Sequence, residues 1–508
     1  MSNLGGCMIK TIVVNVATTW ISVSVYRNGI LPDTHFSIAD FIRRVLYERE
    51  WNPKLKYVEI VSKYLWYDIV HGELRMPRYS LDSFIEYMEA YDFEVEQHIV
   101  EPIVPQSVEM HLRDGIKPRE EQVEAADFLI NNKIGFRPLA LRPGFGKTFL
   151  SINSIVKIGY RAIIVLGQLI DQWLNSIFQF TTLTKDDIYI VRGFDSLKDL
   201  WTMIDNGYKP AIILFSTRTL DLYTVENAEG YNTLRSYEEL CTVLGIGIKV
   251  IDECHLKFGT NSQIDFRSNI KVNIYLSATY QRTSRDGKRI FDMYFPAELK
   301  YGEQLVKRYT TVEFAFYHLN IFREHLSRFK TAKGYNHMLY ENYLVRQRKY
   351  LKLFVNCVVT PMLYQYFFNV RKIGQHCLIL CQTRKFALAL SDALIKKVDE
   401  SETVSVFLSG DKTYGNEEVL KSNIIVSTIK SCGTGRDIKG LKTCINTVSM
   451  ASVPQTIQCL GRLRELPDED TYYIDMCNEE VPSQVNHARI RLDIFKDKAK
   501  LVESFKLM

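Results

Sequence analysis

The chain has 508 residues, of which 46% are hydrophobic and 24% are charged, and its formal net charge is +5. This length suggests roughly three domains at ~150 residues each, which is enough for several packed cores. The mild positive charge permits contact with nucleic acid but does not require it, because a few excess cations are common on any solvated surface. No apolar run approaches the ~20 residues that cross a bilayer, so we expect no membrane contact.

The ten cysteines are scattered along the chain without the spacing of a disulfide framework. Cys377 and Cys381 lie in one apolar segment, but no cluster of further ligands accompanies them, as a metal site would need. We interpret the cysteines as reduced core thiols. They therefore predict a reducing compartment, most simply the cytoplasm, or that of a host if the chain is viral.

The first part of the chain mixes strand and helix patterns. Residues 8–26 alternate and are rich in β-branched side chains, which predicts two strands or a hairpin. Helical patterns follow at residues 37–50 and 80–91. Two prolines within residues 101–105 indicate a linker. Residues 1–105 are therefore predicted to form a small α+β domain.

From about residue 117 the pattern changes to short apolar segments that alternate with helical ones. Fully apolar short strands are typical of a buried parallel sheet, and the helices between them supply the crossovers. A helix-rich stretch at about 320–370 separates two such series, and residues 486–505 are predicted to form a closing amphipathic helix. The predicted strands are residues 138–142, 161–167, 211–216, 248–253 and 272–277 in the first series, and 376–382, 404–409, 423–428, 444–450 and 471–476 in the second.

The segment LRPGFGKT, residues 141–148, joins the end of an apolar strand to the start of an apolar helix. It resembles the phosphate-binding pattern G-x-x-x-x-G-K-[ST], except that Leu141 stands at the first glycine position. Glycines let the backbone N–H groups approach phosphate oxygens at a helix N-terminus. The lysine would neutralise the β- and γ-phosphates, and the threonine hydroxyl would ligate Mg²⁺. A glycine-rich turn with a solvated lysine is the alternative. The candidate residues are Pro143, Gly144, Phe145, Gly146, Lys147 and Thr148.

Two further motifs end strands of the same series. In IKVIDECH a buried strand delivers Asp252 and Glu253 to its carboxyl end, where ligands bind in open α/β sheets. Adjacent buried acids are costly unless they have partners, and an Mg²⁺-binding Asp252 beside a general-base Glu253 would explain them. Exposed strand-end acids are the alternative. The strand in IYLSATY ends in Ser277, Ala278 and Thr279.

In this order the three motifs resemble those of superfamily 2 helicases and translocases, whose first lobe carries a phosphate loop, a D-E-x-H box and S-A-T. The resemblance implies ATP as the nucleotide and an α/β fold of two tandem RecA-like parallel-sheet lobes. The two lobes would span residues 106–312 and 313–508, after the small domain at residues 1–105. It also implies that His255, Ser277, Ala278 and Thr279 couple the ATP site to the rest of the motor.

Other first-lobe positions follow from the same resemblance. KPREEQ, at residues 117–122, resembles the Q-motif, in which Gln122 would hydrogen-bond the adenine edge and Arg119 would help to hold the nucleotide. A plain helix start is the alternative for Gln122. FSTRTL resembles a motif that grips nucleic acid, with Thr217 and Arg218 on backbone phosphates. A simple strand-end turn is the alternative there.

The second series resembles the other lobe of such motors. TIQCLGRLRE carries Gln458, Gly461 and Arg462 of the pattern Q-x-x-G-R-x-x-R, whose arginines reach the γ-phosphate. A planar, always-charged guanidinium can stabilise charge that spreads in the transition state. Because Glu465 occupies the last position of that pattern, we expect Arg462 to be the finger and leave Arg464 as the second candidate.

Two more motifs of this lobe carry candidate contacts. In NIIVSTIKSCGTGRDIKGL, Thr428 would contact a nucleic-acid phosphate. Gly435 and Asp437 would lie at the nucleotide, where Asp437 would contact a sugar or the arginine site. In LILCQTRKF, Thr383 and Arg384 would contact phosphates. Hydroxyls and cations at successive strand ends hold a nucleic-acid backbone without recognising bases.

The segment from Arg285 to Lys288, R-D-G-K after S-A-T, resembles DNA-remodelling members of the superfamily. Together with LRPGFGKT, DECH and the basic helical stretch YENYLVRQRKYLKL it resembles phage recombination helicases of the UvsW kind, and the N-terminal segment at residues 51–76 resembles theirs loosely. This implies ATP-dependent unwinding and branch migration of forked or four-way DNA. The basic and aromatic residues of the N-terminal domain would then grip duplex, or else they are only solvated faces and core aromatics. They are Lys54, Lys56, Tyr57, Lys63, Tyr64, Trp66, Arg75 and Arg78.

Three alternatives remain open at this point. The chain could be an RNA helicase, or the translocating subunit of a restriction system, although no nuclease pattern is evident in the sequence. A binding or annealing protein with a decayed nucleotide site is the alternative of a different class. Intact Lys147, Thr148, Asp252, Glu253 and Arg462 argue against that last alternative.

Overall fold

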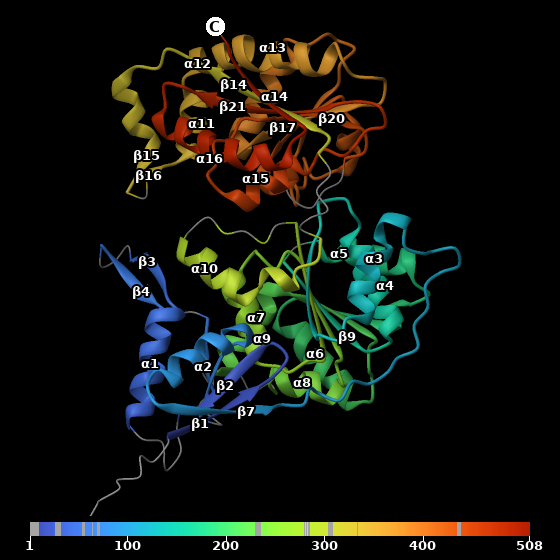
Figure 1. The fold of residues 1–508 in the computed structure, drawn as a ribbon. Coiled ribbons are helices and arrows are strands. Elements are labelled where there is room, and N and C mark those ends of the chain that lie inside the picture. Colours follow the sequence, from blue (N-terminus) through green and yellow to red (C-terminus); the bar gives the residue numbers. More distant parts are fainter. Residues whose placement is uncertain are drawn as a thin grey trace, which may run out of the picture. The chain divides into compact units, whose positions relative to one another are not determined.

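The protein divides into two compact units (Figure 1). The first spans the chain to residue 304 apart from residues 142–144, and the second holds residues 142–144 and 305–508. In the part of the chain that the structure describes, no helix is both long and apolar enough to cross a membrane. The computed structural model describes residues 10–25, 32–52, 56–62, 64–68, 72–167, 169–228, 235–278, 280, 282, 285–302, 308–332, 334–433 and 438–507.

The N-terminal part is a five-stranded mixed sheet with two helices and a separate hairpin, as the predicted α+β character requires. Its elements are β1 (Lys10–Val16), β2 (Trp20–Ser24), α1 (Pro32–Val45), β3 (Glu48–Asn52), β4 (Tyr57–Val61), β5 (Trp66–Asp68), β6 (Glu73–Pro77), α2 (Leu81–Glu89) and β7 (Phe93–Ile99). The sheet order is β5-β6-β2-β1-β7, and among the described strands β3 pairs only with β4. The predicted strands at residues 8–26 are confirmed as the antiparallel pair β1 and β2.

The N-terminal sheet packs on the rest of the first unit through the buried side chain of Arg75. The guanidinium of Arg75 lies 4.2 Å from the ring centroid of Trp20 and 4.8 Å from that of Trp66. Its Nη1 donates to the Phe266 carbonyl at 2.7 Å, and the Trp20 indole donates to the Ser268 carbonyl at 3.1 Å. Arg75 and Trp66 therefore contribute to packing, which is the alternative to a grip on duplex that the sequence left open.

The first unit continues as a six-stranded sheet in which every neighbouring pair is parallel. Its strands are β8 (Phe136–Ala140), β9 (Ala162–Leu166), β10 (Ile188–Val191), β11 (Ile212–Ser216), β12 (Ile248–Ile251) and β13 (Val272–Ser277). Its helices are α3 (Val123–Asn131), α4 (Lys147–Ile158), α5 (Ile170–Phe180), α6 (Phe194–Asp205), α7 (Thr217–Ala228), α8 (Tyr237–Leu244), α9 (Phe258–Phe266) and α10 (Arg285–Tyr294). The order is β10-β11-β9-β12-β13-β8, so all five strands predicted for this series are confirmed and β10 was missed.

The strands of this sheet are apolar on both faces because helices cover both. Ile164 of β9 packs in one core cluster with α3, α4 and α5, while its neighbours Ile163 and Val165 pack in another with α6 to α10. Burying each such side chain contributes about 1.5–3 kcal/mol. This two-sided burial is why the strands read as continuous apolar runs.

The second unit is built on a seven-stranded sheet whose neighbouring strands are likewise parallel. Its strands are β14 (Thr310–Tyr317), β17 (His376–Cys381), β18 (Val404–Phe407), β19 (Ile424–Thr428), β20 (Leu441–Asn446), β21 (Thr471–Asn478) and β22 (Leu501–Lys506). Its helices are α11 (His337–Arg346), α12 (Arg348–Leu353), α13 (Thr360–Leu363), α14 (Arg384–Ile395), α15 (Val453–Leu460) and α16 (Pro482–Lys498), and a small hairpin joins β15 (Lys330–Thr331) to β16 (Gly334–Tyr335). The order is β18-β19-β17-β20-β21-β14-β22.

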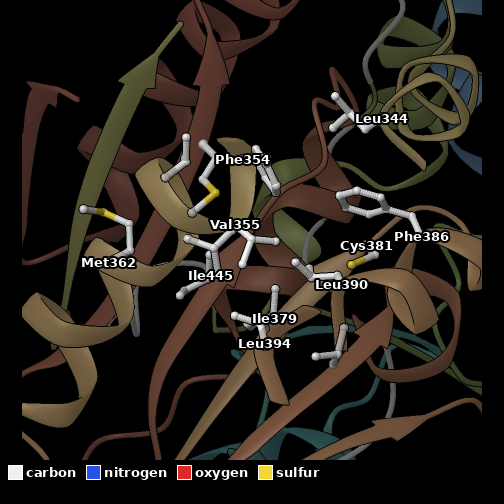
Figure 2. Packing of buried hydrophobic residues seen from close by; sticks show 14 of the residues in the cluster. Leu344, Phe354, Val355, Met362, Ile379, Cys381, Phe386, Leu390, Leu394 and Ile445 are labelled. Carbon is white, nitrogen blue, oxygen red and sulfur yellow. The ribbon is translucent and has the colours of Figure 1, made fainter. Parts of the chain in front are cut away.

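The core of the second unit confirms that the stretch at about 320–370 is rich in helix. α12 continues through π-helical turns at Phe354–Val359 and Tyr364–Phe368 on either side of α13. Figure 2 shows Phe354 and Val355 of this run in one cluster with Ile379 and Ile445 of the sheet. The stretch thus covers one face of the sheet.

Two strand and helix predictions for this unit were wrong in detail. The tail predicted as one helix at residues 486–505 ends its helix at Lys498, and β22 then pairs in parallel with β14. Pairing with the open edge of β14 outweighs helix propensity there. The strand predicted at 444–450 is β20 and ends at Asn446, because the Asn446 side chain bonds both the N–H and the carbonyl of Val448 and turns the chain.

Candidate nucleotide and nucleic-acid sites

The phosphate-type loop lies between β8 and α4. Gly144 and Gly146 have φ angles of 80° and 97°, a left-handed region that suits glycine. Leu141 is fully buried and closes the strand beneath the loop. The Lys147 ammonium donates to the Leu141 carbonyl at 2.8 Å. Lys147 and Thr148 begin α4, so the loop places both at a helix N-terminus, where anions are favoured.

Arg119 and Gln122 hold this loop through one carbonyl oxygen. The Phe145 carbonyl accepts from Gln122 Nε2 at 2.6 Å and from Arg119 Nη2 at 2.9 Å. The other end of the Gln122 amide accepts the Arg119 backbone N–H at 3.0 Å. A Cβ at Gly146 would lie 2.4 Å from Gln122 Nε2, so a larger residue would displace that amide in addition to straining the φ of 97°. The contact with adenine predicted for these two residues stays a prediction.

Asp252 and Glu253 follow the end of β12, as the sequence predicts. Trp173 of α5 donates its indole N–H to Asp252 Oδ2 at 3.0 Å, and the Glu253 N–H donates to Asp252 Oδ1 at 3.0 Å. Burial and the neighbouring Glu253 charge raise the pKa of Asp252 to about 6, while Lys147 acts in the opposite direction. A divalent cation would favour the ionised carboxylate, so the chemistry of this pair fits Mg²⁺, and the shared site with Thr148 stays a prediction.

The turn after β12 connects the acidic pair to the S-A-T segment. The left-handed φ of 50° at Glu253 costs a non-glycine residue on the order of 1 kcal/mol or more. His255 is buried, and its Nδ1 lies 2.8 Å from the Ser277 hydroxyl and 3.3 Å from Glu253 Oε2. Burial, with the Arg282 and Lys147 charges, lowers the pKa of His255 to about 3, so the ring is neutral.

The S-A-T segment also contacts the loop strand, because the Leu141 N–H donates to the Ser277 carbonyl at 3.2 Å. The ends of β12, β13 and β8 are neighbours in the sheet. The first unit therefore brings Lys147, the acidic pair, His255 and Ser277 to one edge, with Ala278 directly after the strand. The predicted residues Lys54, Lys63, Thr279, Gly435 and Asp437 lie outside the described residues.

The predicted arginines of the second unit follow α15. Gln458 is buried within the helix, and its carbonyl accepts from Arg462 Nε at 3.3 Å. The Arg462 side chain is 7% exposed. Arg464 is half-buried and donates to the Gly461 carbonyl. The structure thus places Arg462 deeper in the second unit than Arg464.

The candidate nucleic-acid contacts lie at strand ends in both units. In the first unit Thr217 is buried at the start of α7, after β11, and Arg218 is exposed. In the second unit the Thr383 hydroxyl caps α14 by accepting the Phe386 N–H at 3.2 Å. Thr428 ends β19, and its hydroxyl bonds Ser431 at 2.9 Å.

Three residues that support these sites were not found from the sequence. The first is Trp173, which donates to Asp252. The second is Glu341 of α11, which accepts the backbone N–H groups of Gln382 and Thr383 at 2.6 and 2.7 Å. Asp411 forms an ion pair with the exposed Arg384. No local sequence pattern signals these contacts, because each joins segments that are far apart in the chain.

Two tandem RecA-like parallel-sheet lobes, with these motifs at their strand ends, and a small N-terminal α+β domain make up the fold. No protein-family model and no curated protein matches the sequence. Among solved structures, the chain is similar to the ATP-dependent Type ISP restriction-modification enzyme LlaBIII bound to DNA, with 11% identity and a TM-score of 0.50. That match covers 93% of this chain and 39% of the enzyme.

Two further solved structures match with lower TM-scores. The crystal structure of T4 UvsW has 13% identity and a TM-score of 0.37, over 98% of this chain and 100% of that one. The structure of S. cerevisiae Dbp5 bound to RNA and ADP BeF3 has 14% identity and a TM-score of 0.46, over 77% of this chain and 90% of that one.

Proposed function

We propose that the chain is an ATP-dependent DNA helicase or translocase that unwinds or branch-migrates forked and four-way DNA in replication, recombination or repair. One observation supports it above the others: the loop of Lys147, the Asp252–Glu253 pair and the His255–Ser277 contact converge on one sheet edge. In open α/β sheets, ligands bind at this carboxyl edge. The proposal includes a reducing, ATP-containing compartment such as the cytoplasm.

In this proposal each residue has a separate chemical role. Lys147 would neutralise the β- and γ-phosphates at the N-terminus of α4, and Thr148 with Asp252 would ligate Mg²⁺. Bound Mg²⁺ would offset the charge of the phosphates. Glu253 would orient the attacking water and accept its proton. Arg462 of the second unit would stabilise charge on the γ-phosphate.

Contacts with the nucleic acid would come from Thr217, Arg218, Thr383, Arg384 and Thr428. Hydroxyls and cations at strand ends suit phosphates, and such contacts position a strand without selecting a sequence. Because Asp411 pairs with Arg384 in the structure, nucleic acid would have to displace that carboxylate. Because contacts between cations and phosphates release counterions, binding should weaken steeply as the salt concentration rises.

The test is ATP hydrolysis with single-stranded, duplex, forked and four-way DNA, and with matched RNA. DNA should stimulate hydrolysis, and Lys147→Ala should lower it by about a hundredfold or more, because the phosphates lose their charge partner. Lys157→Ala, in the exposed last turn of the same helix, is the matched control and should behave as wild type. Stimulation by RNA alone would instead favour an RNA helicase.

A further inference from the structure

The β3–β4 hairpin exposes two apolar side chains that no core cluster of the described residues includes. Val58 and Ile60 of β4 are 54% and 65% exposed. They are two residues apart, so both side chains project from the same face of the ribbon. Among the strands that the structure describes, the ribbon pairs with no other, and it extends past α1 beside α10 (Figure 1). Two large β-branched side chains are thus presented on a projecting element.

A bidentate ion pair fixes the ribbon to α10. Arg49, which lies opposite Ile60 in the hairpin, donates Nε and Nη2 to the two oxygens of Asp286 at 2.8 and 2.9 Å. The next turn of α10 adds Arg289, which donates to the carbonyls of Arg44 and Tyr47 at 3.1 and 2.8 Å. Bidentate Arg–carboxylate contacts fix geometry as well as adding energy. The ribbon therefore has a defined position on the first unit.

The same helix carries two cations that do not bind the ribbon. Arg285 and Lys288 of α10 are exposed, and neither has an ion-pair partner among the described residues. Lys56, directly before β4, is exposed as well. Unpaired cations beside an apolar ribbon are complementary to a polyanion that also offers apolar surface.

Duplex DNA offers apolar surface mainly on the faces of its bases. Phosphates, sugars and most groove edges are polar, and base faces become accessible only where the stack ends or opens. Val58 and Ile60 have no hydrogen-bonding groups with which to recognise base edges. They are therefore suited to the end of a stack and not to a closed groove.

We propose that the β3–β4 ribbon is the duplex-opening element of the motor. Val58 and Ile60 pack against the outermost base pair of the duplex, while Arg285 and Lys288 hold the phosphates beside it. This inference rests on the proposed function, since it names where the motor would meet the duplex.

The first test replaces the apolar contact and keeps the strand. In Val58→Thr with Ile60→Thr, both side chains stay β-branched, which preserves the ribbon. The measurements are unwinding of a forked DNA duplex and ATP hydrolysis stimulated by single-stranded DNA. We expect unwinding to fall on the order of tenfold, as for a loss of about 1.4 kcal/mol, and hydrolysis to change less than about twofold. Ile99→Thr, a 70% exposed position on β7, is the matched control.

The second test removes the cations. Arg285→Ala with Lys288→Ala should weaken the binding of forked DNA several-fold and flatten its salt dependence. Lys133→Ala with Lys198→Ala, two exposed lysines elsewhere in the first unit, should leave both unchanged. Circular dichroism of every variant shows whether the fold is intact.

The outcomes separate the two proposals. If no DNA stimulates hydrolysis by the wild type, the proposed function fails and this inference fails with it. If the wild type is stimulated and the ribbon variant unwinds forks as fast as Ile99→Thr does, the inference alone is overturned. It is equally overturned if sedimentation shows that the ribbon variant only changes self-association, because the apolar face would then belong to a second copy of the chain.

Discussion

Among single residues of the second unit, a buried carboxyl group holds Thr383, a candidate contact for nucleic acid, in place. Glu341 is fully buried and accepts the N–H groups of Gln382 and Thr383, directly before α14. Burial raises its pKa from 4.5 to about 7, and the hydrogen bonds from those two residues act in the opposite direction. The orientation of Thr383 therefore depends on a group that titrates near neutral pH.

This shift predicts a pH dependence of stability with a defined sign. Because the folded-state pKa of Glu341 is raised, its favourable contribution is complete below about pH 4.5 and is lost as the pH rises to about 7. Glu341 should thus lower the free energy of unfolding by up to about 1.4 kcal/mol per pH unit between about pH 5 and pH 7. Urea unfolding of wild type and Glu341→Gln at several pH values measures it.

Glu341→Gln should have a smaller slope than the wild type over that interval. Glu313, whose pKa burial and Glu503 raise to about 7, titrates in both proteins and cancels in the comparison. Glu418→Gln, at an exposed position of the same unit, is the control and should keep the wild-type slope. Equal slopes for all three proteins would contradict the assignment to Glu341.

At the scale of elements, one buried ion pair joins the strand of the acidic motif to its neighbours. Lys249 of β12 pairs with Asp265 of α9, and both side chains are fully buried. The Tyr275 hydroxyl of β13 donates to Asp265 at 2.7 Å, and the Tyr294 hydroxyl of α10 donates to the same oxygen. Four elements thus meet at one carboxylate, and its partner Lys249 lies shortly before Asp252 in the chain.

Breaking this pair on one side should be costly. Lys249→Met leaves the Asp265 charge buried without its cation, and we expect a loss of about 3–5 kcal/mol in the free energy of unfolding. Adding Asp265→Asn removes that charge and keeps an acceptor for the tyrosines, so the double variant should regain part of the loss. Urea unfolding measures both, with Lys198→Met on the surface of α6 as the control. A single variant as stable as that control would show that the pair carries no such energy.

The elements differ in how far the sequence predicts them. The strands around the candidate site are buried on both faces, so β9, β12 and β13 appear as apolar runs and were found. β22 was taken for the end of a helix, because it is an exposed edge strand and forms only through its pairing with β14. Such a strand has no signal of its own, since its hydrogen-bond partner lies far away in the chain.

The same reason explains which site residues were found. Lys147 and Asp252 belong to local motifs, in which the spacing itself carries the chemistry. Trp173 contacts Asp252 across 79 residues, and Glu341 contacts Thr383 across 42. The partner of Asp252 is fixed by the packing of α5 on the sheet, so the sequence alone could not identify it.

At the scale of the whole molecule, the predicted catalytic groups are divided between the two units. Lys147, Asp252 and Glu253 belong to the first unit, and Arg462 and Arg464 belong to the second. If the proposed function is right, neither unit alone carries the full set. Hydrolysis would then depend on residues of the second unit even when nucleotide binding by the first is intact.

This division predicts separable effects on binding and turnover. Arg462→Ala should lower DNA-stimulated turnover by about a thousandfold, as expected for a residue that acts on transition-state charge, and change the affinity for ATP less than about tenfold. Because Arg462 is 7% exposed, the thermal midpoint of the variant must be measured too, and Arg462→Lys retains the charge at lower cost in packing. Arg489→Ala, an exposed arginine on α16, is the matched control. If Arg464→Ala lost turnover and Arg462→Ala lost only stability, Arg464 would be the residue that reaches the phosphate, since a buried arginine that only packs has no reason to affect catalysis.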